Sequence, residues 1–116
     1  MKTFWQRYDE KWAHAKRREF EAKTGVPWDF YGARGGMQFT PIVTRETPTD
    51  EALALRLLLH LRPGIGGGEW FVSLAERSGM TLCEVMIAAK TLVYSGRAVA
   101  DVNRTGNFAA IHRRLR

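Results

Sequence analysis

The sequence contains one cysteine, Cys83, so it cannot form a disulfide within the chain. Its histidines are His14, His60 and His112. They lie far apart in sequence, and none has the spacing to Cys83 or to a carboxylate pair that metal sites use. Cys83 also lacks the neighbouring histidine or second cysteine that would mark a nucleophile. We therefore expect a noncatalytic protein, with no catalytic residue, no metal site and no cofactor.

No apolar run approaches the ~20 residues that a membrane-spanning helix needs. The first residues form a charged amphipathic segment instead of the apolar core of a secretory signal. Hydrophobic residues make up 45% of the chain and charged residues 26%, as in globular proteins. The 116 residues can bury one core but not two of usual size. We therefore expect a cytoplasmic protein with one compact domain and an appendage.

The balance of charge is basic, with a net charge of +6. Residues 1–24 have a net charge of +3 and residues 97–116 have +4, whereas residues 47–96 have −1. A small basic protein favours acidic partners, of which nucleic acid is the commonest. The positive charge available to such a partner therefore lies at the two ends of the chain.

Residues 4–24 are predicted to form one helix. Thr3 and Gln6 fit a capping box at its start, and Gly25 and Pro27 end it. At helical spacing, one face is strongly aromatic. Its aromatic residues are Phe4, Trp5, Tyr8 and Trp12. We interpret this face as packing on the C-terminal domain or on a second copy of the chain, giving a homodimer. An exposed surface on which nucleic acid bases stack is the alternative.

Residues 26–46 combine chain-breaking glycine and proline with large aromatic residues, which predicts an ordered connector. The next helix is predicted to start at Thr47, with Pro48 at its first position. Leucines between residues 53 and 61 make this helix apolar nearly all round, so we expect it to be the core helix. Pro63 and Gly64 end it, and three glycines at 66–68 form a loop.

Residues 69–114 show an ordered series of short elements. Residues 69–72 can form a strand, and Ser73 and Glu76 fit a capping box that opens a short helix. Gly79 and Met80 form a turn, and a second capping-box pattern at residues 81–84 opens a second helix. Serine and glycine at 95–96 end that helix. Residues 98–103 and 108–113 are then predicted to be strands that flank a turn at 104–107.

This order of elements resembles the winged helix-turn-helix family of DNA-binding domains, over about residues 47–114. The resemblance implies an α+β fold that is mainly α with a small antiparallel β-hairpin. The chain then divides into an N-terminal amphipathic helix at 1–25, an ordered connector at 26–46 and a winged-helix domain at 47–116. No specific protein is identified by the pattern.

The resemblance implies a protein that binds double-stranded DNA, such as a small transcriptional regulator of bacterial or phage type. In such domains the second helix lies in the major groove and the wing contacts the adjacent backbone or minor groove. The outward positions of that helix would be Leu82, Cys83, Glu84, Met86, Ile87, Lys90 and Thr91. Of these, only Lys90 and Thr91 are side chains that commonly read bases.

The other predicted DNA contacts lie in and around the hairpin, because its arginines suit phosphate and minor-groove contact. The predicted residues are Arg97, Asn103, Arg104, Thr105, Asn107, Arg113, Arg114 and Arg116. If roughly four arginines meet phosphates, the logarithm of affinity falls against the logarithm of salt with a slope near −3 to −4. A solvated charged tail is the alternative interpretation.

A second hypothesis is a winged-helix module that binds another protein, such as a component of a nucleic-acid machine. Leu82, Met86 and Ile87 would form an apolar face of the kind found at adaptable protein interfaces. This hypothesis predicts that the face is covered by a partner or by the N-terminal helix.

Overall fold

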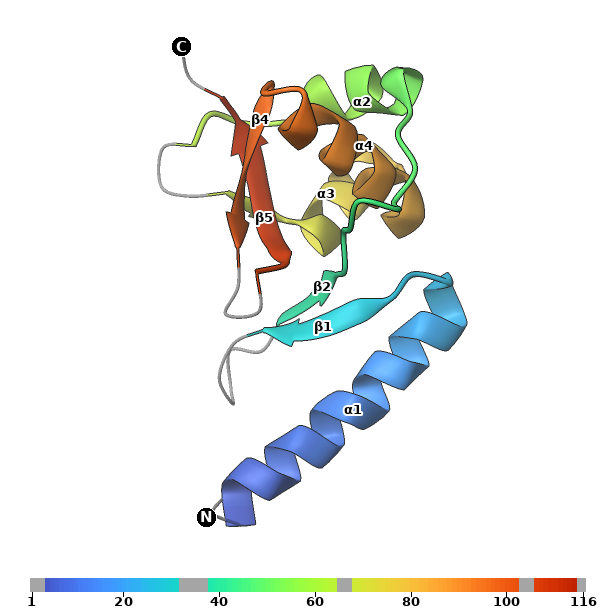
Figure 1. The fold of residues 1–116 in the computed structure, drawn as a ribbon, viewed down its shortest axis with the longest axis vertical. Helices are drawn as coiled ribbons and strands as arrows, with labels where there is room; N and C mark the ends of the chain where they lie inside the picture. Colours follow the sequence, from blue (N-terminus) through green and yellow to red (C-terminus); the bar gives the residue numbers. More distant parts are fainter. Residues whose placement is uncertain (1–3, 32–37, 65–67, 103–105, 115–116) are drawn as a thin grey trace.

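The computed structural model describes residues 4–31, 38–64, 68–102 and 106–114 (Figure 1). For residues 4–10, 12, 13, 29–31, 38–40 and 109 it describes the backbone alone. Helices, a three-stranded antiparallel sheet and a separate two-stranded hairpin make up the described fold, which confirms the predicted α+β class. In Figure 1, the N-terminal helix lies at one end of the molecule and the sheet, with three helices beside it, at the other.

The sheet is formed by β3 (Glu69–Trp70), β4 (Ala98–Val102) and β5 (Phe108–Arg113), in the order β3-β5-β4. The predicted hairpin of β4 and β5 is confirmed, with Ala98 opposite Arg113 and Val102 opposite Phe108. The strand predicted at 69–72 is shorter than expected, because α3 begins at Phe71, and the two residues of β3 pair with Ile111 and Ala110 of β5. Ala98 and Ile111 are buried against the helices, so one face of the sheet forms a wall of the core.

Two helices pack against this face, α3 (Phe71–Ser78) and α4 (Leu82–Tyr94), and α2 (Glu51–Leu58) packs on α4 in the same core. The central one is α4, whose Val85 and Leu92 are completely buried. Its predicted capping box is confirmed, because the side chains of Thr81 and Glu84 each accept a hydrogen bond from the other residue's backbone N–H. Gly79 ends α3 with a φ of +73°, a left-handed conformation that glycine adopts without strain.

The prediction that α2 is the core helix is wrong, because Leu55 is 52% exposed and Leu59, just after the helix, is 85% exposed. Its predicted start is also wrong. The N-cap is Asp50, whose side chain accepts a hydrogen bond from the Leu53 amide at 3.1 Å. The predicted cap at Ser73 is wrong as well, since α3 starts two residues earlier and Ser73 lies inside it.

The N-terminal half has a predicted helix and an unpredicted hairpin. Helix α1 (Phe4–Thr24) has the expected bounds. Within the connector, β1 (Trp28–Tyr31) pairs antiparallel with β2 (Gln38–Pro41). The hairpin lies between α1 and the rest of the molecule in Figure 1. It leads into residues 42–50, which cross α4 on the way to α2.

Candidate nucleic-acid interface

The face of α4 that was predicted to read DNA is largely buried. Met86 is 7% exposed, Lys90 6% and Thr91 9%, so the prediction that they point outward is wrong. Leu82 and Ile87 are half-buried. Only Cys83, at the start of the helix, is exposed as expected. A helix whose outer face is already packed cannot place that face in a major groove.

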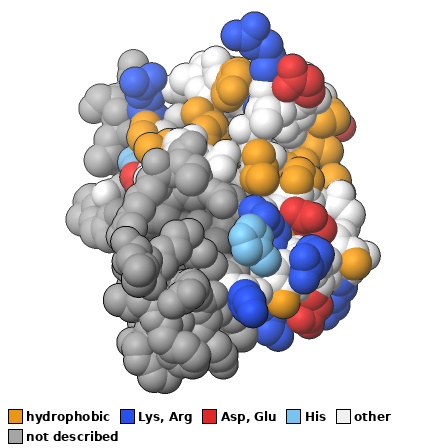
Figure 2. All heavy atoms as spheres, turned by 60° about the horizontal axis from the view of Figure 1, so that its bottom comes forward, with side chains coloured by type: hydrophobic (Ala, Val, Ile, Leu, Met, Phe, Trp, Pro, Cys, Tyr) orange, Lys and Arg blue, Asp and Glu red, His pale blue; other side chains and the backbone are white. Residues whose placement is uncertain are grey.

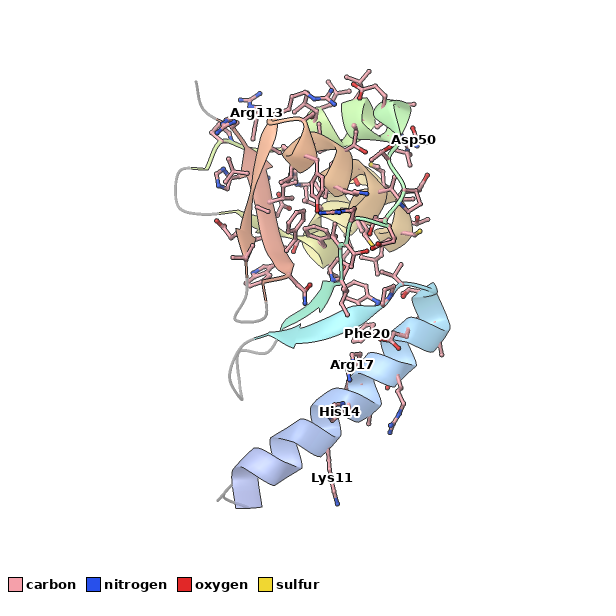
Figure 3. The ribbon with its side chains drawn as sticks, viewed as in Figure 1. Lys11, His14, Arg17, Phe20, Asp50 and Arg113 are labelled. Atoms are coloured by element: carbon pink, nitrogen blue, oxygen red, sulfur yellow. The ribbon has the colours of Figure 1, made fainter. Side chains whose placement is uncertain are left out.

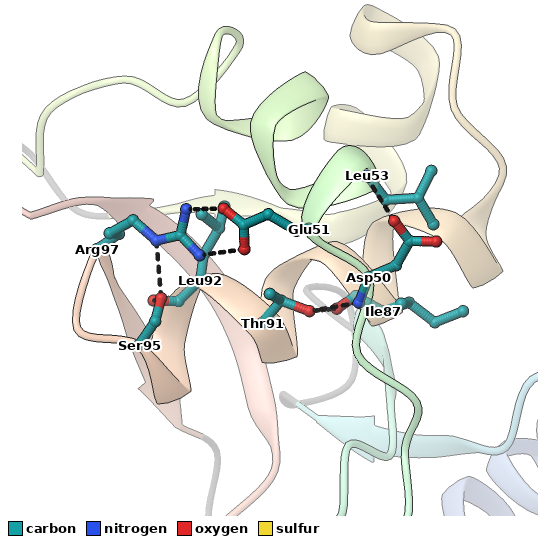
Figure 4. A network of polar contacts seen from close by, with 8 residues as sticks. All are labelled: Asp50, Glu51, Leu53, Ile87, Thr91, Leu92, Ser95 and Arg97. Atoms are coloured by element: carbon teal, nitrogen blue, oxygen red, sulfur yellow. Dashed lines mark hydrogen bonds and ion pairs between the residues drawn. The ribbon is translucent and has the colours of Figure 1, made fainter.

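The two polar side chains on this face hold the segment that crosses it. Lys90 Nζ donates hydrogen bonds to the backbone oxygens of Arg45, at 2.6 Å, and of Thr47. Thr91 Oγ1 accepts a hydrogen bond from the Asp50 amide at 3.0 Å (Figure 4). Their hydrogen-bonding groups are therefore used inside the chain and not available to bases.

The apolar side chains on the same face are covered by the connector. Val26 and Trp28 are buried against Met86, and Phe20 of α1 packs at the edge of this cluster. The Trp28 ring centroid is 5.8 Å from that of Phe20, and its Nε1 donates to Thr24 Oγ1 at 2.9 Å. The alternative hypothesis predicted a cover over this face. The observed cover comes mostly from the residues that follow α1.

Several predicted contacts lie outside what the structure describes. The side chains of Phe4, Trp5, Tyr8 and Trp12 are not described, so the proposed aromatic dimer face is not tested. The wing tip residues Asn103, Arg104 and Thr105 and the terminal Arg116 also lie outside the described residues. Asn107, next to the tip, is half-buried.

Strand pairing divides the predicted hairpin residues into two groups. Arg113 lies opposite Ala98, at the end of the hairpin away from its tip, with Arg97 and Arg114 beside this pair. With ~3.3 Å per strand residue, the five residues of β4 separate the two ends by roughly 17 Å. Arg97, Arg113 and Arg114 therefore belong to the base of the hairpin and not to its tip.

The fold brings one more arginine to this base. The Arg113 amide donates to the carbonyl oxygen of Arg62 at 2.9 Å, which places the first part of the α2–β3 connection beside β5. The Arg114 guanidinium donates to the Gly96 oxygen at 3.2 Å. We call Arg62, Arg113 and Arg114 the hairpin-base cluster. Sequence reasoning missed Arg62, because it lies in a region whose net charge is slightly negative and about 50 residues before its neighbours.

The charge of Arg97 is already balanced. Its Nη1 and Nη2 donate to the two carboxylate oxygens of Glu51 at 2.5 and 2.8 Å, and its Nε donates to Ser95 Oγ at 2.8 Å (Figure 4). The hydrogen bond from Arg97 is the main cause that lowers the pKa of Glu51 below 4.5. By contrast, the three arginines of the hairpin-base cluster are exposed and form no ion pair with a described carboxylate.

The Glu51–Arg97 pair predicts a specific pH dependence of stability. A carboxyl whose pKa is lowered by folding stabilises the protein above its unfolded pKa, and this contribution is lost as pH falls through the folded-state value. Glu51→Gln is therefore expected to lower the urea midpoint at neutral pH. The difference from the parent protein should disappear as pH falls below 4.5 and through the lowered pKa.

Urea unfolding followed by circular dichroism across this pH range measures the effect. Glu76→Gln is the matched control, because Glu76 is exposed and has no described ion-pair partner. It should leave the midpoint close to that of the parent at each pH. If the urea midpoint of Glu51→Gln stays below that of the parent by the same amount at acidic pH, the proposed contribution of the Glu51–Arg97 pair is contradicted.

A second basic group lies on α1, at the other end of the molecule. Figure 3 places Arg113 far from Lys11 and Arg17. Lys16 Nζ is 3.2 Å from Glu19 Oε2, so part of this charge is paired. Figure 2 turns this end forward and shows blue Lys and Arg side chains among red carboxylates in its described part. Within the described residues, the two basic groups therefore do not merge into one patch.

Other kinds of site are not evident in the described part of the chain. No group of three His, Cys, Asp or Glu side chains there could hold a metal ion. None of the described helices is both long and apolar enough to span a membrane. Comparisons with family models, curated proteins and solved structures found no match to this chain.

Proposed function

We propose that residues 47–114 form a winged helix that binds the phosphate backbone of double-stranded DNA. The order of elements supports the proposal. Helix α2, strand β3, helices α3 and α4 and the β4–β5 hairpin follow one another as in that family, and β5 lies between β3 and β4. The protein would act without catalysis, in a role such as that of a small transcriptional regulator.

The hairpin-base cluster is the observation on which this proposal depends. Its three arginines are exposed, come from two distant parts of the chain that a backbone hydrogen bond joins, and form no ion pair with a described carboxylate. Arginine binds phosphate well because its planar fork of donors matches two phosphate oxygens. Because α4 is covered, we expect contact with the backbone to dominate and discrimination between DNA sequences to be weak.

A salt titration tests the proposal. Fluorescence anisotropy with a random-sequence duplex should show binding at low salt with a dissociation constant of tens of micromolar or tighter. If each arginine of the cluster meets one phosphate, the logarithm of affinity should fall against the logarithm of salt with a slope of about −3. Arg113→Gln combined with Arg114→Gln should reduce this slope to about −1.

The matched control removes two charges from the other end of the molecule, through Lys11→Gln and Arg18→Gln. Both residues are exposed on α1. This control should keep the parent slope. If both double variants reduce the salt slope equally, only the net charge of the protein matters. If the parent protein does not bind the duplex at tens of micromolar, DNA binding is refuted.

The second candidate is a protein-docking module, and a different surface from the predicted one now supports it. Leu55 and Leu59 are four residues apart, at one face of α2 and its C-terminal end, and both are largely exposed. Single exposed leucines are common, but a neighbouring pair suits a partner's apolar side chain. Two results together would favour this candidate. The parent protein would not bind the duplex, and it would self-associate in sedimentation experiments whereas the Leu59→Glu variant would not.

A further inference from the structure

A cavity lies beside the hairpin-base cluster, where the chain leaves the edge of β5 and returns to it. Pro63 forms a parallel bridge to Arg113, and six residues later Glu69 pairs with Ile111. Between these two contacts is a cavity of about 320 Å³. This volume is at the lower end of the range of small-molecule sites, about 300–1,000 Å³.

The cavity has one basic wall and one aromatic wall. Its side chains include Arg62, Trp70, Ser73 and His112. Arg62 is exposed and has no described ion-pair partner, while Trp70 is half-buried. Ser73 is exposed on the first turns of α3 and offers a hydroxyl group. A guanidinium, an indole and a hydroxyl are the groups that bind a phosphate and a planar base.

The one carboxylate in the wall is neutralised by a neighbour. Glu69 accepts hydrogen bonds from Arg77 Nη2 at 2.6 Å and from Arg77 Nε at 3.1 Å. Arg77 also donates to the His60 carbonyl oxygen, which fixes this pair in place. Arg62 is therefore the charged lining side chain that no described carboxylate neutralises, and it can bind an anion.

Backbone packing holds the basic end of the cavity in one shape. A side chain at Gly64 would clash with the ring of His112, so the chain passes directly over that ring. On the other side, the Gly68 amide donates to Asp101 Oδ2 at 3.0 Å, and Asp101 Oδ1 is 3.9 Å from His112 Nε2. These contacts fix His112 and both ends of the connection, so the wall is formed before any ligand binds.

We propose that this cavity binds one nucleotide, with its base against Trp70 and its phosphate at the Arg62 guanidinium. The inference rests on the proposed function, because a strand held by the hairpin-base cluster would present such a nucleotide to the adjoining cavity. A free mononucleotide and an unpaired nucleotide at the end of a DNA strand both offer a base and a phosphate. The test therefore measures the binding of each one separately.

The test uses the full chain labelled with ¹⁵N, titrated in turn with AMP, a blunt duplex, and the same duplex bearing a 5′-phosphorylated single-stranded overhang. The Trp70 indole signal is identified with Trp70→Phe. We expect AMP to shift this signal and the amide signals of Gly68 and Ser73 saturably. The overhang duplex should shift them at lower concentrations than the blunt duplex.

Two variants check the assigned contacts. Arg62→Gln should weaken AMP binding about tenfold, because it removes hydrogen bonds to a charged group. Ser73→Ala should weaken it by a smaller factor without disturbing the strand pairing. Arg18→Gln is the matched control, since it removes one exposed arginine far from the cavity, and it should leave AMP binding unchanged.

The outcomes separate this inference from the proposed function. Duplex binding without any shift at Trp70, by AMP or by the overhang, would overturn the nucleotide cavity and leave the winged-helix proposal standing. AMP binding that depends on Arg62 without duplex binding would support the cavity and refute DNA binding. Equal effects of the overhang and blunt duplexes, with AMP bound, would assign the cavity to free nucleotides. If Arg62→Gln and Arg18→Gln weaken AMP binding equally, the proposed nucleotide site in the cavity is overturned.

Discussion

Trp28→Ala is expected to destabilise the packing of the N-terminal half on α4 by about 3–5 kcal/mol, the usual loss for a buried tryptophan. The Trp28 side chain has no exposed surface, and its cluster with Val26 and Met86 is separate from the main core. The variant should therefore open α1 and the β1–β2 hairpin locally, before the sheet and the other helices unfold.

Hydrogen exchange measured by mass spectrometry checks this result. Peptides from residues 20–31 should lose protection, while peptides from α3 and β5 should keep theirs. Trp28→Phe is the control, because it retains a ring against Phe20 and loses the hydrogen bond to Thr24, so its effect should be smaller. Unchanged exchange in residues 20–31 of the alanine variant would show that Trp28 does not hold the cover on α4.

Lys90→Ala is expected to lower the free energy of unfolding by about 2–4 kcal/mol. The substitution leaves the Arg45 and Thr47 carbonyl groups without their charged donor, and an unsatisfied buried polar group costs about 1–3 kcal/mol. It also removes the buried stem of the side chain and the contact of the ammonium with the Tyr94 ring, whose centroid is 5.4 Å away.

Lys90→Met separates the two contributions, because it keeps the stem and removes the ammonium group. Its expected loss is about 1–3 kcal/mol, measured by urea unfolding. Lys23→Met is the matched control at an exposed position of α1 and should change stability by less than about 0.5 kcal/mol. A Lys90→Met protein as stable as the parent would contradict the role of Lys90 in holding residues 45–47.

The covered face of α4 changes which residues the proposed DNA binding can use. The sequence pattern assigned base reading to Lys90 and Thr91, and both side chains instead bind the segment that crosses the helix. In and beside the described strands, the exposed arginines without a described ion-pair partner are those of the hairpin-base cluster. Contact with phosphates through this cluster is therefore the mode of binding to test first, with the neighbouring cavity as a separate site.

Local sequence by itself determined the bounds of α1 and α4, the end of α3 and the position of the β4–β5 hairpin. Thr81 and Glu84 form the capping box that their spacing predicts, because both partners lie within one helical turn. Gly79 adopts the left-handed conformation at the end of α3, and the β4–β5 hairpin forms around its predicted turn. Each of these features depends on contacts between residues a few positions apart, which a sequence displays directly.

Only the tertiary structure decided which faces are covered and which charges come together. Lys90 meets the Arg45 carbonyl across 45 positions, and the Arg113 amide meets the Arg62 carbonyl across 51. An amphipathic pattern shows that a helix has an apolar face, but not whether solvent, a partner or its own chain lies against it. The face of α4 is covered by its own chain. Val26 and Trp28 bury their apolar surface against Met86, and removal of apolar surface from water stabilises this arrangement.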